Sequence, residues 1–187
     1  MAATKKRGTQ LTGTWYVEKV GPCSIRSVGN KDVERIDVAW PTLRPSGAPH
    51  LNWKWKEIRE ATQEQFRIES EGQTVAIWAS KRTAVKLGGK TWYRLDFLEV
   101  DPAKTGILLG AFTMCAVANR AVELRRDGLL LGAFPQVADF YRALDGKQEL
   151  VSGWKCESGL VPFVFEREAL GKLKERIHDF VEEAEEK

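Results

Sequence analysis

The sequence predicts a mixed α/β (α+β) fold built around a long central helix, and three observations support this. Residues 66–100 contain short runs of aromatic and β-branched residues separated by turn glycines, which is typical of antiparallel strands. Residues 106–124 are apolar on nearly all sides, as in a buried helix. Residues 166–187 have one apolar stripe, which is typical of a helix that packs by one face.

The N-terminal part predicts one strand and two helices. Trp15 to Val20 mixes aromatic and β-branched residues and stops at Gly21-Pro22, so we expect a strand with a breaker behind it. Asn30 to Trp40 has a weak helical spacing of apolar residues. Leu51 to Thr62 contains strong helix formers, and Asn52 is the expected N-cap of a short helix.

The middle of the chain predicts an antiparallel meander of three strands. Phe66 to Glu69 and Thr74 to Val85 are separated by Glu71-Gly72. Gly88-Gly89 then turns the second strand into a third strand from Thr91 to Val100.

The long helix is expected from Gly106 to Leu124, with arginines in and after its last turn and Gly128 as its C-terminal cap. Leu129 to Ala133 is a wholly apolar run of the kind found in central strands. Gln136 to Leu144 follows Pro135 and predicts a helix opened by a proline.

The C-terminal part predicts a hairpin and a final helix. Leu150 to Cys156 and Leu160 to Phe165 flank Glu157-Ser158-Gly159, a hairpin turn signal. Glu166 to Lys187 should form an extra C-terminal helix that packs by one stripe.

Composition excludes several classes of protein. A hydrophobic content of 43% argues against a disordered chain, and 187 residues fit one domain over residues 11–187 after a flexible polar tail, residues 1–10. The 29 basic and 26 acidic residues give a net charge of only +3, so there is no strong nucleic-acid signal. The tail lacks the apolar run of a secretory signal, and residues 106–118 are too short to span a membrane. We therefore expect a cytoplasmic protein.

Cysteine and histidine usage predicts no metal site. Cys23, Cys115 and Cys156 are widely separated and odd in number, so we expect reduced thiols. Only His50 and His178 are available as imidazole ligands. Cys115 lies within the apolar helix, where a packing role is expected and not that of a nucleophile.

The order of the predicted elements suggests a family. A meander is followed by a turn, a long helix, an apolar strand and the segment Pro135-Gln136-Val137-Ala138-Asp139-Phe140-Tyr141. This segment is similar to the short helix that carries a Phe-Tyr pair in the GNAT superfamily of N-acetyltransferases, and residues 73–165 resemble that superfamily. The resemblance implies a mostly antiparallel central sheet flanked by helices, with residues 11–72 on the acceptor side and residues 73–165 on the cofactor side.

The resemblance implies acetyl-CoA as cosubstrate, with its diphosphate at the N-terminus of the long helix, where free N–H groups suit an anion. The family turn carries a cation and then glycines two apart. Counting forward from Pro102 places Thr105, Leu108 and Gly110 there, and only Gly110 matches. Starting from Gly106 again places Leu108 at the second glycine. The implied cofactor-binding residues are Leu98, Val100, Lys104, Thr105, Gly106, Ile107, Leu108, Leu109 and Gly110.

Two side chains carry the implied chemistry. Tyr141 matches the family tyrosine that protonates the departing thiolate, although core packing explains it equally well. Glu99 is the predicted base. Asp96 lies on the same strand but, by simple alternation, on the opposite face unless a bulge intervenes. Solvation, or pairing with Arg94 or Lys90, is the alternative for both carboxylates.

Two functions remain open at this stage. The first is an acetyl-CoA-dependent N-acetyltransferase acting on a primary amine of a small molecule, peptide or aminoacyl group. Trp40, Trp53 and Trp55 fall in the part that forms the acceptor wall in the superfamily, with core packing as the alternative. The second is a non-catalytic GNAT-like binding or interaction module, in which Leu108 or its neighbours fill the diphosphate site. A homodimer is compatible with either.

Overall fold

The computed structural model describes residues 15–18, 20–44, 46, 53–104 and 107–180. The strands are β1 (Trp15–Val17), β2 (Gly21–Ser27), β3 (Glu64–Ser70), β4 (Gln73–Leu87), β5 (Lys90–Val100), β6 (Gly128–Ala133), β7 (Lys147–Gln148) and β8 (Val161–Glu166). The α-helices are α1 (Asn30–Ala39), α2 (Trp55–Ala61), α3 (Ile107–Glu123), α4 (Ala138–Ala143) and α5 (Arg167–Glu175). Short 3-10 turns are η1 (Trp40–Thr42), η2 (Pro102–Lys104), η3 (Pro135–Val137) and η4 (Arg176–Phe180).

One sheet of eight strands organises this part of the chain, in the order β1-β2-β3-β4-β5-β6-β8-β7. Every neighbouring pair is antiparallel except β5 and β6, which run parallel. A parallel pair needs a crossover connection, and α3 provides it. The predicted fold class and the predicted meander are therefore confirmed.

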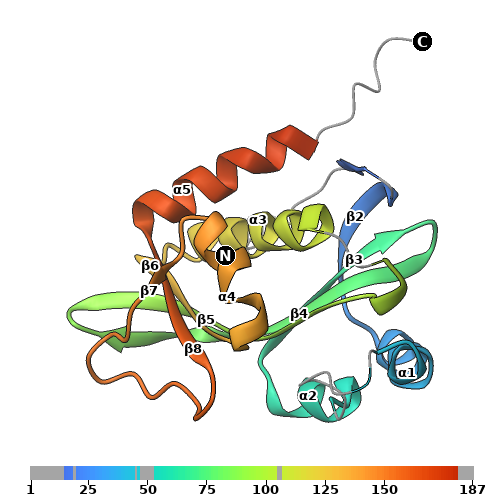
Figure 1. Ribbon diagram of the computed structural model, residues 1–187, viewed down its shortest axis with the longest axis horizontal. Coiled ribbons are helices and arrows are strands. Elements are labelled where there is room, and N and C mark those ends of the chain that lie inside the picture. Colours follow the sequence, from blue (N-terminus) through green and yellow to red (C-terminus); the bar gives the residue numbers. More distant parts are fainter. Residues whose placement is uncertain (1–14, 19, 45, 47–52, 105–106, 181–187) are drawn as a thin grey trace, which may run out of the picture.

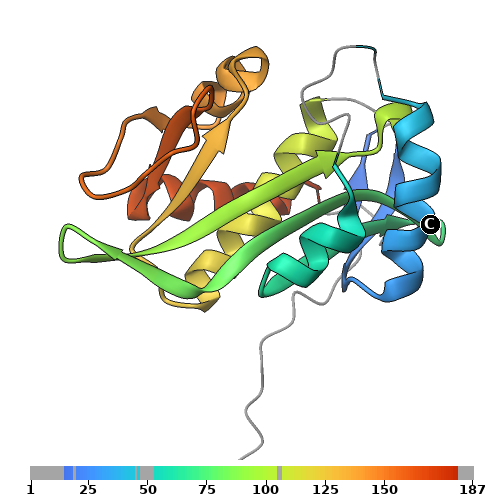
Figure 2. The same ribbon diagram turned by 90° about the horizontal axis from the view of Figure 1, so that it is seen from below.

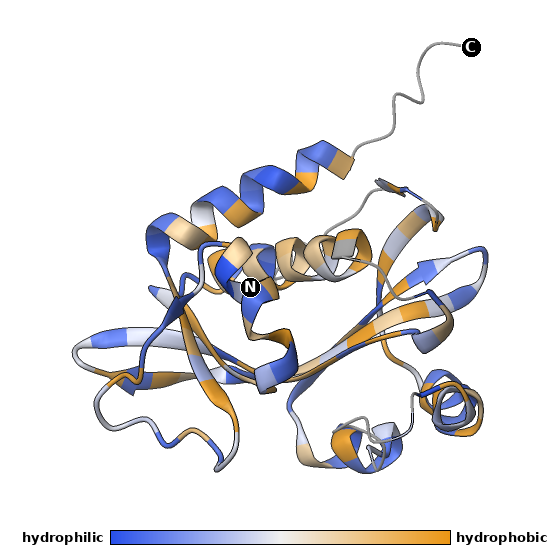
Figure 3. Ribbon diagram, in the orientation of Figure 1, coloured by the Kyte–Doolittle hydropathy of each residue, from blue (hydrophilic) through white to orange (hydrophobic). Residues whose placement is uncertain are grey.

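Helices cover both faces of the sheet (Figure 1). On one face α3 packs on the sheet and α5 lies beyond it, in a core that contains Phe112, Leu129 and Leu170. On the other face α1 and α2 enclose a second cluster, which includes Trp40, Trp55 and Ile77. Hydropathy follows this arrangement, since α3 is apolar along most of its length and α5 alternates between apolar and polar residues (Figure 3).

The end of α3 differs from the sequence prediction. Arg125 has a left-handed φ of 54°, and its N–H donates to the Val122 carbonyl while the N–H of Arg126 donates to the Ala121 carbonyl. These two bonds form a Schellman cap in which Arg125 takes the position expected of a glycine. Gly128 is not the cap but the first residue of β6, where a Cβ would lie 2.3 Å from the Trp92 ring.

Two further predictions are wrong. Gly21 and Pro22 do not break the sheet but begin β2, because Gly21 takes φ of 93° and pairs with Val17 in a tight hairpin. Residues 150–156 form no strand. The strand β8 pairs with the two-residue β7 instead, and residues 149–160 form a loop. Within the loop Trp154 is buried against Trp92, Leu130 and Val164, so packing on the sheet face replaces backbone pairing.

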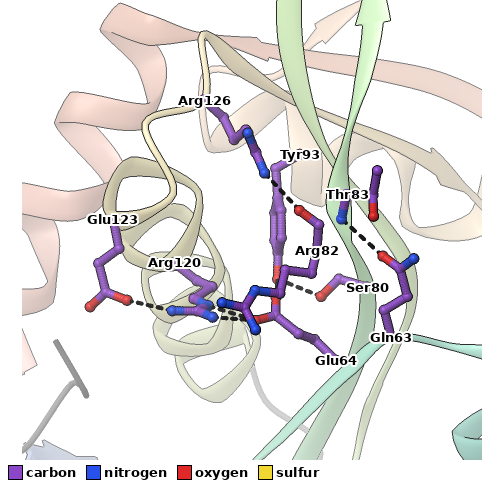
Figure 4. Close-up of polar contacts among 9 residues, drawn as sticks. All are labelled: Gln63, Glu64, Ser80, Arg82, Thr83, Tyr93, Arg120, Glu123 and Arg126. Carbon is purple, nitrogen blue, oxygen red and sulfur yellow. Dashed lines mark hydrogen bonds and ion pairs between the residues drawn. The ribbon is translucent and has the colours of Figure 1, made fainter. Parts of the chain in front are cut away.

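A partly buried polar network links α3 to the sheet (Figure 4). The Glu64 carboxylate accepts hydrogen bonds from Arg120 Nε at 3.0 Å and from the Tyr93 hydroxyl at 3.1 Å. Tyr93 also bonds to Ser80, and Arg120 Nη1 contacts Glu123 at 3.0 Å. The network joins β3, β4, β5 and α3 through side-chain hydrogen bonds.

No helix in the described ranges is both long enough and apolar enough to cross a membrane.

Candidate active site

A β-bulge in β5 determines which side chains face each side of the sheet. Ser80 pairs with Leu95 and Ala79 pairs with Phe97, so Asp96 is an extra residue on β5. As a result Leu95 packs in the α3 core whereas Phe97 packs against the cluster of α1 and α2. The bulge that the alternation argument allowed for is therefore present.

The two parallel strands separate just after this bulge. Pairing of β5 with β6 runs from Trp92 opposite Gly128 to Leu95 opposite Leu131, and no later pair is formed between the described residues of these strands. Beyond that point β6 diverges from β5, as Figure 2 shows from below. Residues 96–100 of β5 consequently have one paired edge, against β4, and one edge that faces the gap.

A cavity of about 720 Å³ occupies this gap. Its walls come from both faces of the sheet, so the cavity passes between the diverging strands. The α3 face contributes Leu98, Val100, Pro102, Gly110, Val137, Phe140 and Tyr141. The opposite face and the loop 149–160 contribute Trp53, Ala61, Thr62, Lys81, Arg94, Asp96, Phe97, Glu99, Phe134, Trp154, Lys155, Cys156, Glu157 and Leu160, among others.

Tyr141 reaches the cavity from α4. Its ring packs on Phe140 and Phe163, with centroid distances of 5.1 and 5.5 Å. Burial alone raises the pKa of Tyr141 to about 12, so the phenol keeps its proton at neutral pH. No hydrogen bond from this hydroxyl to another described residue is formed, whereas the Tyr93 hydroxyl is bonded to Ser80 and Glu64. The Tyr141 hydroxyl is thus available to a ligand.

Gly110 places α3 close to α4. A Cβ at Gly110 would lie 3.2 Å from the Phe140 ring, and both residues line the cavity. The glycine that matched the family turn therefore has a packing role in this chain. Leu108 is 37% exposed and does not line the cavity.

Glu99 lies at the other side of the cavity in a buried ion pair. Its carboxylate accepts hydrogen bonds from Arg44 Nε at 2.7 Å, from Arg44 Nη2 at 2.9 Å and from Trp55 Nε1 at 2.7 Å. The side chains of Arg44 and Glu99 are 0% and 3% exposed. Pairing with Arg94 or Lys90 is therefore wrong for Glu99, which instead joins β5 to the segment before α2.

Asp96 is the other carboxylate of the cavity. Its Oδ1 accepts a hydrogen bond from Arg94 Nε at 2.5 Å, which confirms the pairing predicted for it. Its Oδ2 is buried and has no hydrogen-bond partner among the described residues. Burial is the largest influence on this group and raises the pKa of Asp96, while Arg94 and Lys81 act in the opposite direction and Glu157 adds to the rise.

Three aromatic rings form one wall of the cavity. The Trp53 ring lies edge-on to Phe97 at 5.2 Å and tilted to Phe134 at 6.0 Å. Phe97 belongs to β5 and Phe134 follows β6, so Trp53 bridges the two diverging strands. Trp40 and Trp55 are core residues, 4% and 0% exposed, and only Trp53 of the three tryptophans lines the cavity.

The predicted site residues are only partly brought together. Tyr141, Glu99, Leu98, Val100 and Gly110 line the cavity. Lys104 lies in η2 and is not among the lining residues, and Leu109 lies in the first turn of α3 and is buried in the core. Thr105, Gly106 and the Asn52 cap lie outside the described residues, and Ile107 and Leu108 begin α3.

Several residues in the cavity wall or in contact with it have no signal in the sequence. Arg44 pairs with Glu99 across 55 positions, and nothing in the local pattern of Arg44 indicates that contact. The loop with Trp154 and Cys156 has the composition of a strand. The sequence shows Asp96 as a carboxylate near Glu99, but it does not show the bulge that places Asp96 on the same face of the sheet as Glu99. The described residues contain no group of three or more metal-ligating side chains.

No family model matches the sequence, and no curated protein matches it. Solved structures do match. A GNAT family acetyltransferase from Brucella melitensis, solved in complex with acetyl-CoA, is 22% identical, with 79% of this chain and 97% of that chain covered and a TM-score of 0.52.

Two other structures agree. A GNAT family acetyltransferase from Listeria monocytogenes is 14% identical to this chain. The match covers 82% of this chain and 99% of that chain, with a TM-score of 0.57. The ribosomal-protein-S18-alanine N-acetyltransferase from Escherichia coli is 17% identical to this chain. The match covers 76% of this chain and 90% of that chain, with a TM-score of 0.54. This chain has the GNAT fold, which confirms the fold that the sequence predicted.

Proposed function

We propose that this protein is an acetyl-CoA-dependent N-acetyltransferase that transfers the acetyl group to a primary amine by direct attack on the thioester. The observation that carries the proposal is the gap between β5 and β6, which opens at the bulge into a cavity lined by Tyr141 from one face and by Asp96 from the other. The likeness to GNAT structures, one of them solved with acetyl-CoA, supports it.

The residues present fit the cosubstrate. The edge of β5 over residues 96–100 is not paired with β6, so its backbone groups can bond the amides of an extended pantetheine arm, as an added strand would. Leu98 and Val100 give that edge an apolar flank. The diphosphate would lie at the first turn of α3, where backbone N–H groups have no partner within the helix.

The reaction needs proton transfers that these side chains can serve. An ammonium group first loses one proton to solvent, and the nitrogen then forms a bond to the acetyl carbon while the carbon–sulfur bond breaks. The nitrogen gives up a second proton, and the thiolate takes one from the Tyr141 hydroxyl, which regains it in turn. A backbone N–H on the open edge of β5 would bind the oxyanion. One proton is released in total.

Glu99 and Tyr141 have different roles in this proposal. Both oxygens of Glu99 already accept hydrogen bonds from Arg44 and Trp55, which suits a structural support for β5. Its assignment as the base stays a prediction. The Tyr141 hydroxyl forms no hydrogen bond with another described residue and lines the cavity, and it is the proposed proton donor.

A non-catalytic module with the same fold is the second candidate. It is favoured by Leu108, a bulky residue where the family turn has a glycine. However, Leu108 is partly exposed at the first turn of α3 and does not line the cavity, so it leaves the space for the pantetheine arm and the acetyl group open. We therefore favour the enzyme.

Titration with acetyl-CoA separates the two candidates. A ligand that binds only the native state at 100 times its Kd stabilises that state by about 2.7 kcal/mol, which is measurable as a rise in Tm. Calorimetric binding at micromolar acetyl-CoA, together with release of free CoA thiol when an amine is added, would support the enzyme. Absence of binding at millimolar acetyl-CoA would favour the module.

Tyr141→Phe tests the proton donor. We expect turnover to fall by roughly 10²-fold, the scale of general acid catalysis, with acetyl-CoA affinity unchanged. Because the hydroxyl has no described protein partner, the free energy of unfolding should change by less than about 1 kcal/mol. Tyr93→Phe is the matched control, since it removes a buried hydroxyl that is bonded to Ser80 and Glu64 outside the cavity. It should lower stability more than turnover. Equal turnover of Tyr141→Phe and wild type would remove Tyr141 from the mechanism.

A further inference from the structure

Asp96 is a carboxylate in an unusual setting. Its side chain is 12% exposed, and its Oδ2 is buried without a hydrogen-bond partner among the described residues, although it lines the cavity. Leaving a buried carboxylate oxygen unsatisfied costs free energy of the order of 1–3 kcal/mol. A water, an ion or a ligand can supply the missing donor to such a group, and the position of Asp96 in the cavity wall points to a ligand.

The bulge sets the direction of this carboxylate. Leu95 and Leu98 pack in the α3 core, whereas Phe97 packs toward α1 and α2. Arg94 and Asp96 are two residues apart and bonded to each other, so both point away from the α3 core. Asp96 therefore lies on the same side of the sheet as the aromatic wall of Trp53, Phe97 and Phe134.

The charges around Asp96 favour a donor at Oδ2. Arg94 is bonded to Oδ1, and Oδ2 receives no hydrogen bond from a described residue. Lys81, Lys155 and Glu157 also line this part of the cavity, and Lys155 and Glu157 are exposed to solvent. A protonated amine can satisfy Oδ2, whereas an anion cannot. The aromatic wall beside it suits a flat apolar substituent and can also face a cation.

We propose that Asp96 and the aromatic wall form the acceptor subsite, in which Asp96 Oδ2 binds the amine and Trp53, Phe97 and Phe134 hold an aromatic or flat apolar substituent. This assignment rests on the proposed function, because the amine that binds to Asp96 is the amine that the enzyme acetylates. It narrows the acceptor from any primary amine to a small primary amine carried on such a substituent. Asp96 then also accepts the second proton of the nitrogen as the carbon–nitrogen bond forms.

The probes are 2-phenylethylamine and ethylamine, which differ by the ring alone. Wild type should bind and acetylate 2-phenylethylamine at least about 10-fold better than ethylamine, because the ring buries apolar area against the wall. Trp53→Ala should reduce this preference, because it removes one ring of the wall. If wild type shows no preference for 2-phenylethylamine, the assigned substituent is wrong.

Asp96→Asn tests the amine contact, with Asp96→Glu as the charge-conserving variant. We expect amine binding, measured by calorimetry without acetyl-CoA, to weaken by about 10–100-fold in Asp96→Asn, the scale of a hydrogen bond to a charged group. In the complete assay kcat/KM for 2-phenylethylamine should fall by roughly 10²-fold or more, with acetyl-CoA affinity unchanged and partial recovery in Asp96→Glu. Glu123→Gln is the matched control, because Glu123 is a half-buried carboxylate bonded to Arg120 outside the cavity.

The two measurements separate this inference from the function on which it rests. If wild type binds acetyl-CoA and acetylates amines but Asp96→Asn does so equally well, the subsite is wrong and the enzyme stands. If 2-phenylethylamine binds in an Asp96-dependent way and acetyl-CoA does not bind, the subsite stands and the enzyme is wrong. A wild-type protein that binds acetyl-CoA but not 2-phenylethylamine also overturns the subsite.

Discussion

Replacing Glu99 by glutamine should destabilise the protein strongly. The carboxylate accepts two hydrogen bonds from Arg44 and one from Trp55, at 2.7–2.9 Å, and the two ion-paired side chains are almost fully buried. The amide that replaces the carboxylate would have one acceptor oxygen and would turn an N–H donor toward the guanidinium. Breaking a buried pair by removing one partner costs about 3–5 kcal/mol, because a buried charge loses its compensation.

Urea denaturation measures this loss directly, and Tm should fall with it, by about 2–4 °C for each kcal/mol in a protein of this size. The double variant Glu99→Gln/Arg44→Met removes both charges, so part of the stability should return. Residual activity in the double variant would show that Glu99 is a support for β5 and not the base. If Glu99→Gln has wild-type stability but no turnover, this reasoning is refuted and Glu99 is the base.

Two further predictions concern packing and reactivity. Gly128→Ala should cost about 1–3 kcal/mol in urea denaturation, because its Cβ would lie 2.3 Å from the Trp92 ring, whereas Gly171→Ala in α5 meets nothing within 4 Å and should stabilise by about 0.5–1 kcal/mol. Equal effects of the two would contradict the packing argument. A thiol reagent at pH 8, followed by mass spectrometry, should label Cys156 in the native protein and acetyl-CoA should slow the labelling, since Cys156 lines the cavity. Burial raises the pKa of Cys115 to about 11, so labelling of Cys115 before unfolding would argue against the described core.

Local patterns are sufficient to predict most of the fold. The apolar run of α3 and the glycine turns of the meander identify their elements because burial and turn geometry both depend on short stretches of sequence. Residues 150–156 are misleading because a strand and an apolar loop have similar composition. Trp154 packs on the sheet with its side chain, and the backbone of the loop pairs with no strand over these residues.

The candidate site is less predictable because it depends on one inserted residue. Alternation along β5 places Asp96 and Glu99 on opposite faces, and the bulge at Asp96 reverses that relation. A bulge is decided by the register of β4 against β5, which no local pattern of β5 records. The partner of Glu99 is equally hidden, since Arg44 is distant in the sequence and lies after a helix that the sequence only weakly predicts.

Two polar clusters, one partly buried and one almost fully buried, explain how the gap between the strands stays open. The network of Glu64, Tyr93 and Arg120 holds β5 against β3 and α3 where β5 still pairs with β6. Beyond the bulge, Glu99 is held by Arg44 toward α1 and α2, on the side away from α3. With β5 fixed at both ends, its free edge cannot close on β6 without breaking a buried ion pair. The strength of the Glu99 pair and the shape of the cavity are therefore linked, and a variant that loosens Glu99 should weaken acetyl-CoA binding as well as stability.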